Sequence, residues 1–192
     1  GVVRTEGKVV GVEQNPETSF YRLTLRLTTL GQRFYVATGI PDISQPILDR
    51  LAADCREFAR LAVVDGDSLT WLAHAQGATG GLLYQPSLTT STVPLYATAT
   101  GKVWLATLPV DQAIRNVKRE GFDGADRFGP SVIRSLAALR REIELTAQRG
   151  FGIAMNEAEP GVTAVAAAIR QAGGGPALGT VSTGRPVAAA SS

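Results

Sequence analysis

Apolar residues recur along the chain with two different periods, and the changes between the periods divide it into elements. Leu23, Leu27 and Leu30 recur every three or four positions among arginines, which predicts a connecting helix with a basic outer face. We place this helix at residues 25–37. The first 24 residues instead contain short β-type runs around the turn at Asn15-Pro16. The chain is therefore predicted to begin with short strands and one helix.

The next stretch predicts a helix followed by a hairpin. Ser44 is a candidate N-cap with Pro46 in the first turn, and apolar residues then mark one helix face at positions 47, 48, 51, 55 and 58. Two apolar runs at residues 61–64 and 69–73 flank Asp65-Gly66, a dipeptide typical of a type I′ hairpin turn. The single cysteine, Cys55, lies on the apolar helix face and is interpreted as a buried structural thiol.

The second half of the chain alternates strands with helices. We predict strands at residues 82–84, 151–156, 162–169 and 177–183, with one helix from Pro109 that stops at Gly121 and another over 131–149. Gly150 follows the second helix as a C-terminal cap, and residues 184–192 are predicted to fray. Short turns between neighbouring strands indicate an antiparallel sheet with the helices on its faces. The predicted fold class is α+β.

One stretch, VPLYATATGKVWLA at residues 93–106, joins a hydroxyl-rich loop to a short apolar helix. Five small residues in a row, 97–101, allow the backbone to come close to another group. The stretch is either a helix start packed tightly on a sheet or the wall of a pocket for a small molecule.

Composition narrows the function classes. The chain has 192 residues, 44% of them hydrophobic and 19% charged, and a net charge of only +2, which does not indicate a surface that coats nucleic acid. No window approaches 18 consecutive apolar residues, and the first residues do not resemble a signal peptide. A single cysteine fits a reducing compartment. We therefore expect one domain with an arm, no membrane association and a cytoplasmic location.

The side chains needed for catalysis are scarce. The only histidine, His74, and the only cysteine lie on different predicted elements, which argues against Ser-His or Cys-His catalysis and against a metal site. Glu157 and Glu159 are interpreted as a solvated acidic turn rather than an acid-base pair. The glycine-rich loop at residues 76–81 lacks the Lys-Ser/Thr of a phosphate loop. We expect neither an enzyme nor a cofactor.

Several segments together resemble the IclR family of bacterial transcriptional regulators. They follow one another in the family's order over nearly the whole chain. They are GVVR (1–4), YRLTLRL (21–27), PLYATATGK (94–102), RGFG (149–152), NE (156–157) with GV (161–162), VAAAI (165–169) and GTVSTG (179–184).

The resemblance implies a regulator that responds to a small-molecule effector. Residues 1–24 would be the end of a winged helix-turn-helix DNA-binding domain, residues 25–37 a linker helix, and residues 38–192 a GAF-like effector-binding domain. DNA would be bound by a domain largely absent from this chain, and family members form homodimers or homotetramers. The alternative is a stand-alone sensor of GAF or PAS type that signals to a protein partner.

The resemblance also implies an effector pocket between the sheet and the 93–106 stretch. Its lining, carried over motif by motif, would be Leu82, Gln85, Val93, Ala99, Thr100, Ala154, Val162, Ala164, Val181 and Thr183.

Two positions in this lining depart from family members that bind small carboxylates. Those members have an acidic residue at the Ala154 position and a hydroxyl at the Val181 position. We therefore expect an apolar or aromatic effector with one polar end, unless Ala154 and Val181 are merely core residues of a collapsed pocket. For Lys102, an outward-pointing ion pair with a carboxylate is favoured over contact with the effector.

Overall fold

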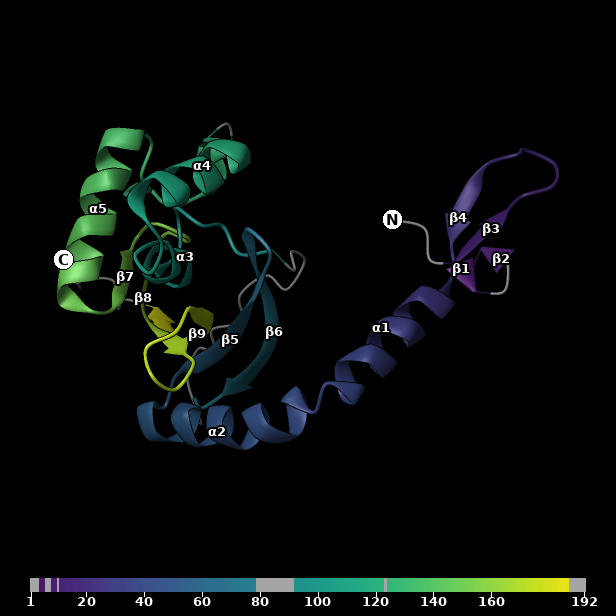
Figure 1. Cartoon of the computed structure of the whole chain (residues 1–192), viewed down its shortest axis with the longest axis horizontal. Coiled ribbons are helices and arrows are strands. Elements are labelled where there is room, and N and C mark those ends of the chain that lie inside the picture. The colour runs from purple at the N-terminus through teal and green to yellow at the C-terminus, as the bar shows by residue number, and fades with distance from the viewer. Residues whose placement is uncertain (1–3, 6–7, 10, 79–91, 123, 187–192) are drawn as a thin grey trace. The chain divides into compact units, whose positions relative to one another are not determined.

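A computed structural model describes residues 4–5, 8–9, 11–78, 92–122 and 124–186, which divide into an N-terminal unit of residues 1–44 and a C-terminal unit of residues 45–192 (Figure 1). In the N-terminal unit β1 (Arg4–Thr5) pairs with β2 (Lys8–Val9), and β3 (Val12–Gln14) pairs with β4 (Tyr21–Leu23). Helix α1 (Leu25–Ala37) follows, at the residues predicted from its leucine spacing. The assignment of residues 1–24, 25–37 and 38–192 to three functional parts stays a prediction.

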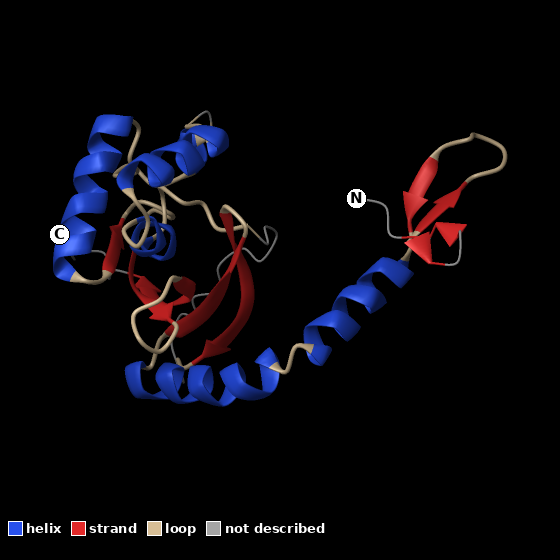
Figure 2. Ribbon diagram, in the orientation of Figure 1, coloured by secondary structure: helices blue, strands red, loops and turns tan. Residues whose placement is uncertain are grey.

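The C-terminal unit is built on a five-stranded antiparallel sheet, as the α+β prediction required (Figure 2). Its order is β6-β5-β9-β8-β7. The strands are β5 (Phe58–Asp65), β6 (Ser68–Gln76), β7 (Gly152–Met155), β8 (Val162–Arg170) and β9 (Ala177–Pro186).

The helices of this unit cover the sheet. They are α2 (Ile40–Cys55), which begins in the N-terminal unit, α3 (Ala99–Leu105), α4 (Val110–Glu120) and α5 (Leu136–Arg149), with the short 3₁₀ helix η1 (Ala125–Arg127). Helix α3 lies directly on the sheet, because its Ala99 and Val103 pack against Ala154 and Ala166, whose side chains end at Cβ. Within the described ranges, no helix has the length and apolar character that crossing a membrane requires.

Two predicted helix starts are wrong. Helix α2 begins at Ile40 rather than after Ser44, and Pro46 lies inside it. Phe58 opens strand β5 instead of extending the helix face, because the chain turns at Arg56, which has a φ of 54°. Helix α5 begins at Leu136, where Ser135 Oγ accepts a hydrogen bond from Ala138 N at 3.3 Å. The first error came from taking Ser44 as the N-cap, and the second from extending the apolar pattern of α5 back to residue 131.

The strand ends also differ from the prediction. The β5–β6 hairpin turns through Gly66 and Asp67, of which only Gly66 has a positive φ (59°), as a type II′ turn requires. Strand β9 continues to Pro186, so residues 184–186 are paired rather than frayed. The predicted strand at 82–84 and most of the hydroxyl-rich loop lie outside the described residues.

Candidate functional site

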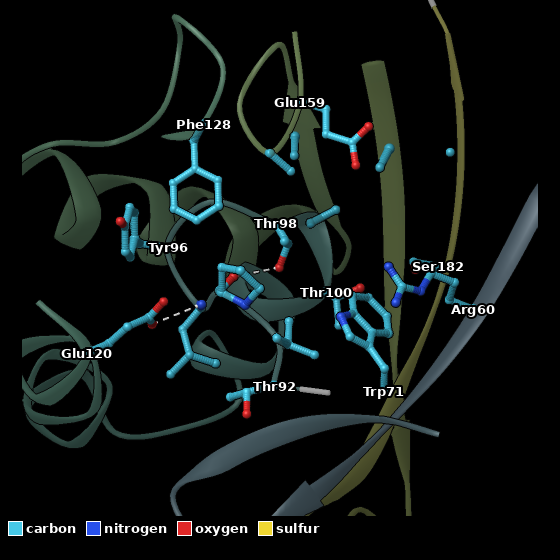
Figure 3. Close-up of a pocket in the computed structure, with 18 of the residues that line it drawn as sticks. Arg60, Trp71, Thr92, Tyr96, Thr98, Thr100, Glu120, Phe128, Glu159 and Ser182 are labelled. Atoms are coloured by element: carbon cyan, nitrogen blue, oxygen red, sulfur yellow. Dashed lines mark hydrogen bonds between the residues drawn. The ribbon is translucent and has the colours of Figure 1, made fainter. Parts of the chain in front are cut away.

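A cavity of about 1130 Å³ lies between the sheet and the segment that leads into α3 (Figure 3). The floor on β7, β8 and β9 carries mainly small side chains, namely those of Ala154, Ala164 and Ser182, with Gly184 beside them and Val162 at the start of β8. Because these side chains end within one or two atoms of Cα, they leave unfilled the volume that larger side chains would occupy. The cavity is thus encoded by the small residues of three strands.

The wall opposite the floor is the stretch of small residues before and within α3. The Thr98 hydroxyl accepts a hydrogen bond from Gly101 N at 2.9 Å and donates one to Pro94 O at 2.8 Å, which caps the helix. Gly101 lies so close to Leu95 that an added Cβ would be 2.3 Å from Leu95 O. The stretch therefore packs tightly on one side and lines a cavity on the other, while its contact with a small molecule stays a prediction.

Thr100 is the polar group that this wall contributes. Only 2% of its surface is exposed, it lines the cavity, and its hydroxyl has no hydrogen-bond partner among the described residues. Its oxygen is not one of the fully buried side-chain atoms that lack a partner, so it stays accessible to water or to a ligand in the cavity.

A charged side chain that the sequence analysis missed also lines the cavity. Arg60 projects from β5, and its Cζ lies 3.6 Å from the centre of the Trp71 ring on β6. In the pairing of β5 with β9, the residue opposite Arg60 is Ser182. Figure 3 shows Arg60, Trp71 and Ser182 together on one side of the cavity. The available signal was one arginine within the otherwise apolar run FARLAVV at residues 58–64.

Most of the predicted lining residues meet at this cavity. Those that line it are Val93, Ala99, Thr100, Ala154, Val162, Ala164 and Thr183. Leu82 and Gln85 lie outside the described residues. The structure shows where these residues lie, while their contact with an effector stays a prediction.

Val181 does not line the cavity, and the alternation of side chains along β9 explains the error. Val181 pairs with Leu61 and Ala167, whereas Ser182 pairs with Arg60 and Ala166, so the two point to opposite faces of the sheet. Thr183 borders the cavity, but its side chain lies on the Val181 face, where its Oγ1 is 3.4 Å from Cys55 Sγ at the end of α2. The hydroxyl on the cavity side therefore comes from Ser182.

Lys102 forms a buried ion pair beside the cavity. Its Nζ lies 2.6 Å from both carboxylate oxygens of Glu157 and donates to Ile153 O at 3.0 Å. The expected partner class, a carboxylate, is present, but the outward direction is wrong because only 2% of the lysine is exposed. Glu157 is likewise buried, which corrects its interpretation as a solvated acid.

The ion pair belongs to a larger network. Glu142 of α5 lies 3.8 Å from Lys102 Nζ and 2.7 Å from an Arg149 guanidinium nitrogen, which also donates to Thr146 Oγ1. Burial raises the pKa of Glu157 above its ordinary value, while the hydrogen bond from Lys102 acts in the opposite direction. The described residues contain no group of His, Cys, Asp and Glu suited to a metal ion.

Comparison with known proteins decides the family. The family described as bacterial transcriptional regulator IclR C-terminal matches residues 32–187. The chain belongs to the IclR family of bacterial transcriptional regulators. This confirms the resemblance drawn from the sequence motifs.

Named IclR relatives agree with this assignment. The transcriptional regulator XynR of Escherichia coli is 30% identical over 158 residues, covering 81% of this chain and 60% of that protein. Across the curated relatives, the chain spans 52–60% of their length. They are transcriptional regulators, which agrees with the prediction that the chain is not an enzyme.

Solved IclR structures share the fold. The IclR protein of Thermotoga maritima superposes with a TM-score of 0.70 at 24% identity, covering 93% of this chain and 69% of that one. An IclR homologue from Microbacterium hydrocarbonoxydans, solved with 4-hydroxybenzoate, superposes with a TM-score of 0.68 at 22% identity, covering 93% of this chain and 71% of that one. The antiparallel sheet flanked by helices is thus the architecture of IclR effector-binding domains.

Proposed function

We propose that this chain is the effector-binding part of a ligand-responsive regulator, and that a small molecule in the cavity controls DNA binding by an adjoining winged helix-turn-helix domain in the bacterial cytoplasm. The observation that carries the proposal is the cavity of about 1130 Å³, which combines a floor of small apolar residues with a few polar groups. Cavities of this kind and approximate size are typical of small-molecule sites.

The lining favours an aromatic effector with one acidic end. Arg60 presents a guanidinium whose face is held on Trp71, and its edge suits a carboxylate. Ser182 and Thr100 are the nearby hydroxyls, and the alanine floor offers a flat apolar surface. A structure of the same fold was solved with 4-hydroxybenzoate. This class agrees with the prediction of an apolar or aromatic molecule with one polar end.

The effector would control DNA binding by changing how the subunits of the oligomer are arranged. In a homodimer or homotetramer, the effector would favour one arrangement of the subunits and so change the spacing of two DNA-reading helices. A ligand shifts such an equilibrium only by the difference between its affinities for the two arrangements. The effector therefore has to contact the cavity differently in each arrangement.

Replacing Thr100 with tryptophan is expected to abolish the effector response without unfolding the domain. The indole would occupy the cavity beside α3, whereas Thr100→Ser keeps the hydroxyl and should keep the response. The measurement is operator binding by the full regulator with and without effector, together with the melting temperature of each variant. A full response from the tryptophan variant would show that the effector binds elsewhere.

Replacing Arg60 with methionine is expected to weaken benzoate binding by about 10- to 100-fold, the usual worth of a charge-assisted hydrogen bond. Arg60→Lys should recover only part of the affinity, since lysine cannot bind a carboxylate with two parallel hydrogen bonds. Arg170→Met, at the exposed end of β8, is the matched control and should bind benzoate normally. Calorimetric titration gives the dissociation constants, and equal affinities for the Arg60 and Arg170 variants would remove Arg60 from the site.

A further inference from the structure

The turn between β7 and β8 is a rigid part of the cavity wall. Asn156 has a positive φ of 54°, and its Oδ1 accepts a hydrogen bond from Gly161 N at 2.7 Å. Its backbone N donates to Val162 O at 2.9 Å. The turn is therefore closed by both side-chain and backbone hydrogen bonds.

Contacts from other elements hold the same turn in place. Gly129 N donates to Glu157 O at 2.7 Å, and Ser131 N donates to Asn156 O at 3.0 Å. Gly129 approaches so closely that an added Cβ would be 2.1 Å from Asn156 O. The buried pair between Glu157 and Lys102 fixes the turn to α3. A loop attached at three places has little freedom to move its side chains out of the cavity.

Glu159 is the charged side chain that this turn presents to the cavity. Its carboxylate points into the cavity, at a different point of the wall from Arg60 (Figure 3). Among the described residues, Glu159 has no ion pair and no side-chain hydrogen bond. Three other charged residues of the lining have protein partners: Asp67 pairs with Arg119, and the Glu120 carboxylate accepts a hydrogen bond from Leu95 N. Arg127 is exposed to solvent.

We propose that Glu159 selects effectors by charge, so that the cavity accepts a single carboxylate at Arg60, rejects a second one, and favours a cationic group at the other end of the molecule. This inference rests on the proposed effector site. A second negative charge near Glu159 is repelled in a partly buried space, where charges are poorly screened, while an ammonium group is attracted. The ligand class is therefore an aromatic monocarboxylate or an aromatic amino-carboxylate, and not a dicarboxylate.

Three probes that share one ring and one carboxylate test this inference. Benzoate, terephthalate and 4-(aminomethyl)benzoate carry no charge, a negative charge and a positive charge at the para position. For the wild-type chain, calorimetry is expected to show terephthalate binding at least about tenfold more weakly than benzoate, and 4-(aminomethyl)benzoate binding more tightly than benzoate. In Glu159→Gln, which keeps the shape and removes the charge, the differences should shrink to about threefold or less.

The controls separate selection by charge from loss of folding and from failure of the effector site itself. Glu144→Gln, at an exposed position of α5, should keep the wild-type order, and all variants should melt at the wild-type temperature. An unchanged terephthalate-to-benzoate ratio in Glu159→Gln overturns the inference, as does the absence of binding for all three probes. After either of these outcomes, operator binding by the full regulator is measured with other small molecules. A response to one of them would leave the proposed function standing, so that only the charge selection fails.

Discussion

Replacing Lys102 with methionine is expected to destabilise the C-terminal unit by about 3–5 kcal/mol at neutral pH, the usual cost of leaving one member of a buried ion pair alone. Glu157 would keep its burial and lose the ammonium group that lies 2.6 Å from both of its oxygens. Glu142 would suffer less, because Arg149 remains 2.7 Å from it. Urea unfolding followed by circular dichroism measures the loss.

Two further variants show whether the loss comes from the unpaired carboxylate. Lys118→Met, at an exposed position of α4, removes the same charge and should cost less than about 1 kcal/mol. Lys102→Met combined with Glu157→Leu replaces both charges by apolar groups and should recover most of the stability, since a buried pair is seldom worth more than its apolar replacement. A double variant as unstable as Lys102→Met would show that the loss does not come from the unpaired carboxylate of Glu157.

The same pair has a pH signature whose sign follows from the raised pKa of Glu157. The folded protein holds this proton more tightly than the unfolded chain, so the contribution of Glu157 to stability is full below about pH 4.5 and falls as pH rises through the folded pKa. Lys102 lowers that pKa, so its removal should raise the pKa further and extend the fall to higher pH. The loss caused by Lys102→Met should therefore shrink in acid, where Glu157 is neutral.

Replacing Gly101 with alanine is expected to destabilise the C-terminal unit by about 1–3 kcal/mol, as an overpacked site does. The new Cβ would lie 2.3 Å from Leu95 O and 2.5 Å from Leu95 Cα, and both are backbone atoms that cannot rotate away. Helix α3 or the segment at residues 94–96 has to shift, although alanine favours a helix by up to about 1 kcal/mol over glycine.

Gly31 provides the matched control in a different helix. It lies inside α1, where an added Cβ would meet nothing within 4 Å, so Gly31→Ala should be neutral or stabilising. Thermal unfolding of both variants measures the contrast. A stabilising Gly101→Ala would show that α3 does not depend on its close approach to Leu95.

Local signals in the sequence predicted those elements whose boundaries depend on near neighbours. The leucine spacing placed α1 at residues 25–37, and Gly150 ends α5 with a φ of 81°, because helix periodicity and a left-handed cap act within a few residues. The start of α5 was predicted five residues too early, at Ser131, because the apolar residues Val132 and Ile133 before the helix extend its periodic pattern backwards. The helix begins where Ser135 caps it, and its Leu139 and Ile143 lie in the common core.

By itself, the sequence determined the family, the order of the elements, the antiparallel sheet and the stretch of small residues beside the cavity. Only the tertiary structure decided which neighbouring side chains face that cavity. A shift of one residue along a strand exchanges the two faces of a sheet, so Ser182 lines the cavity while Val181 does not. Arg60 and Trp71 meet because two strands pair, and Lys102 and Glu157 meet because α3 lies on small side chains of β7 and β8. Each of these contacts depends on how strands and helices pack together, which the local sequence pattern does not specify.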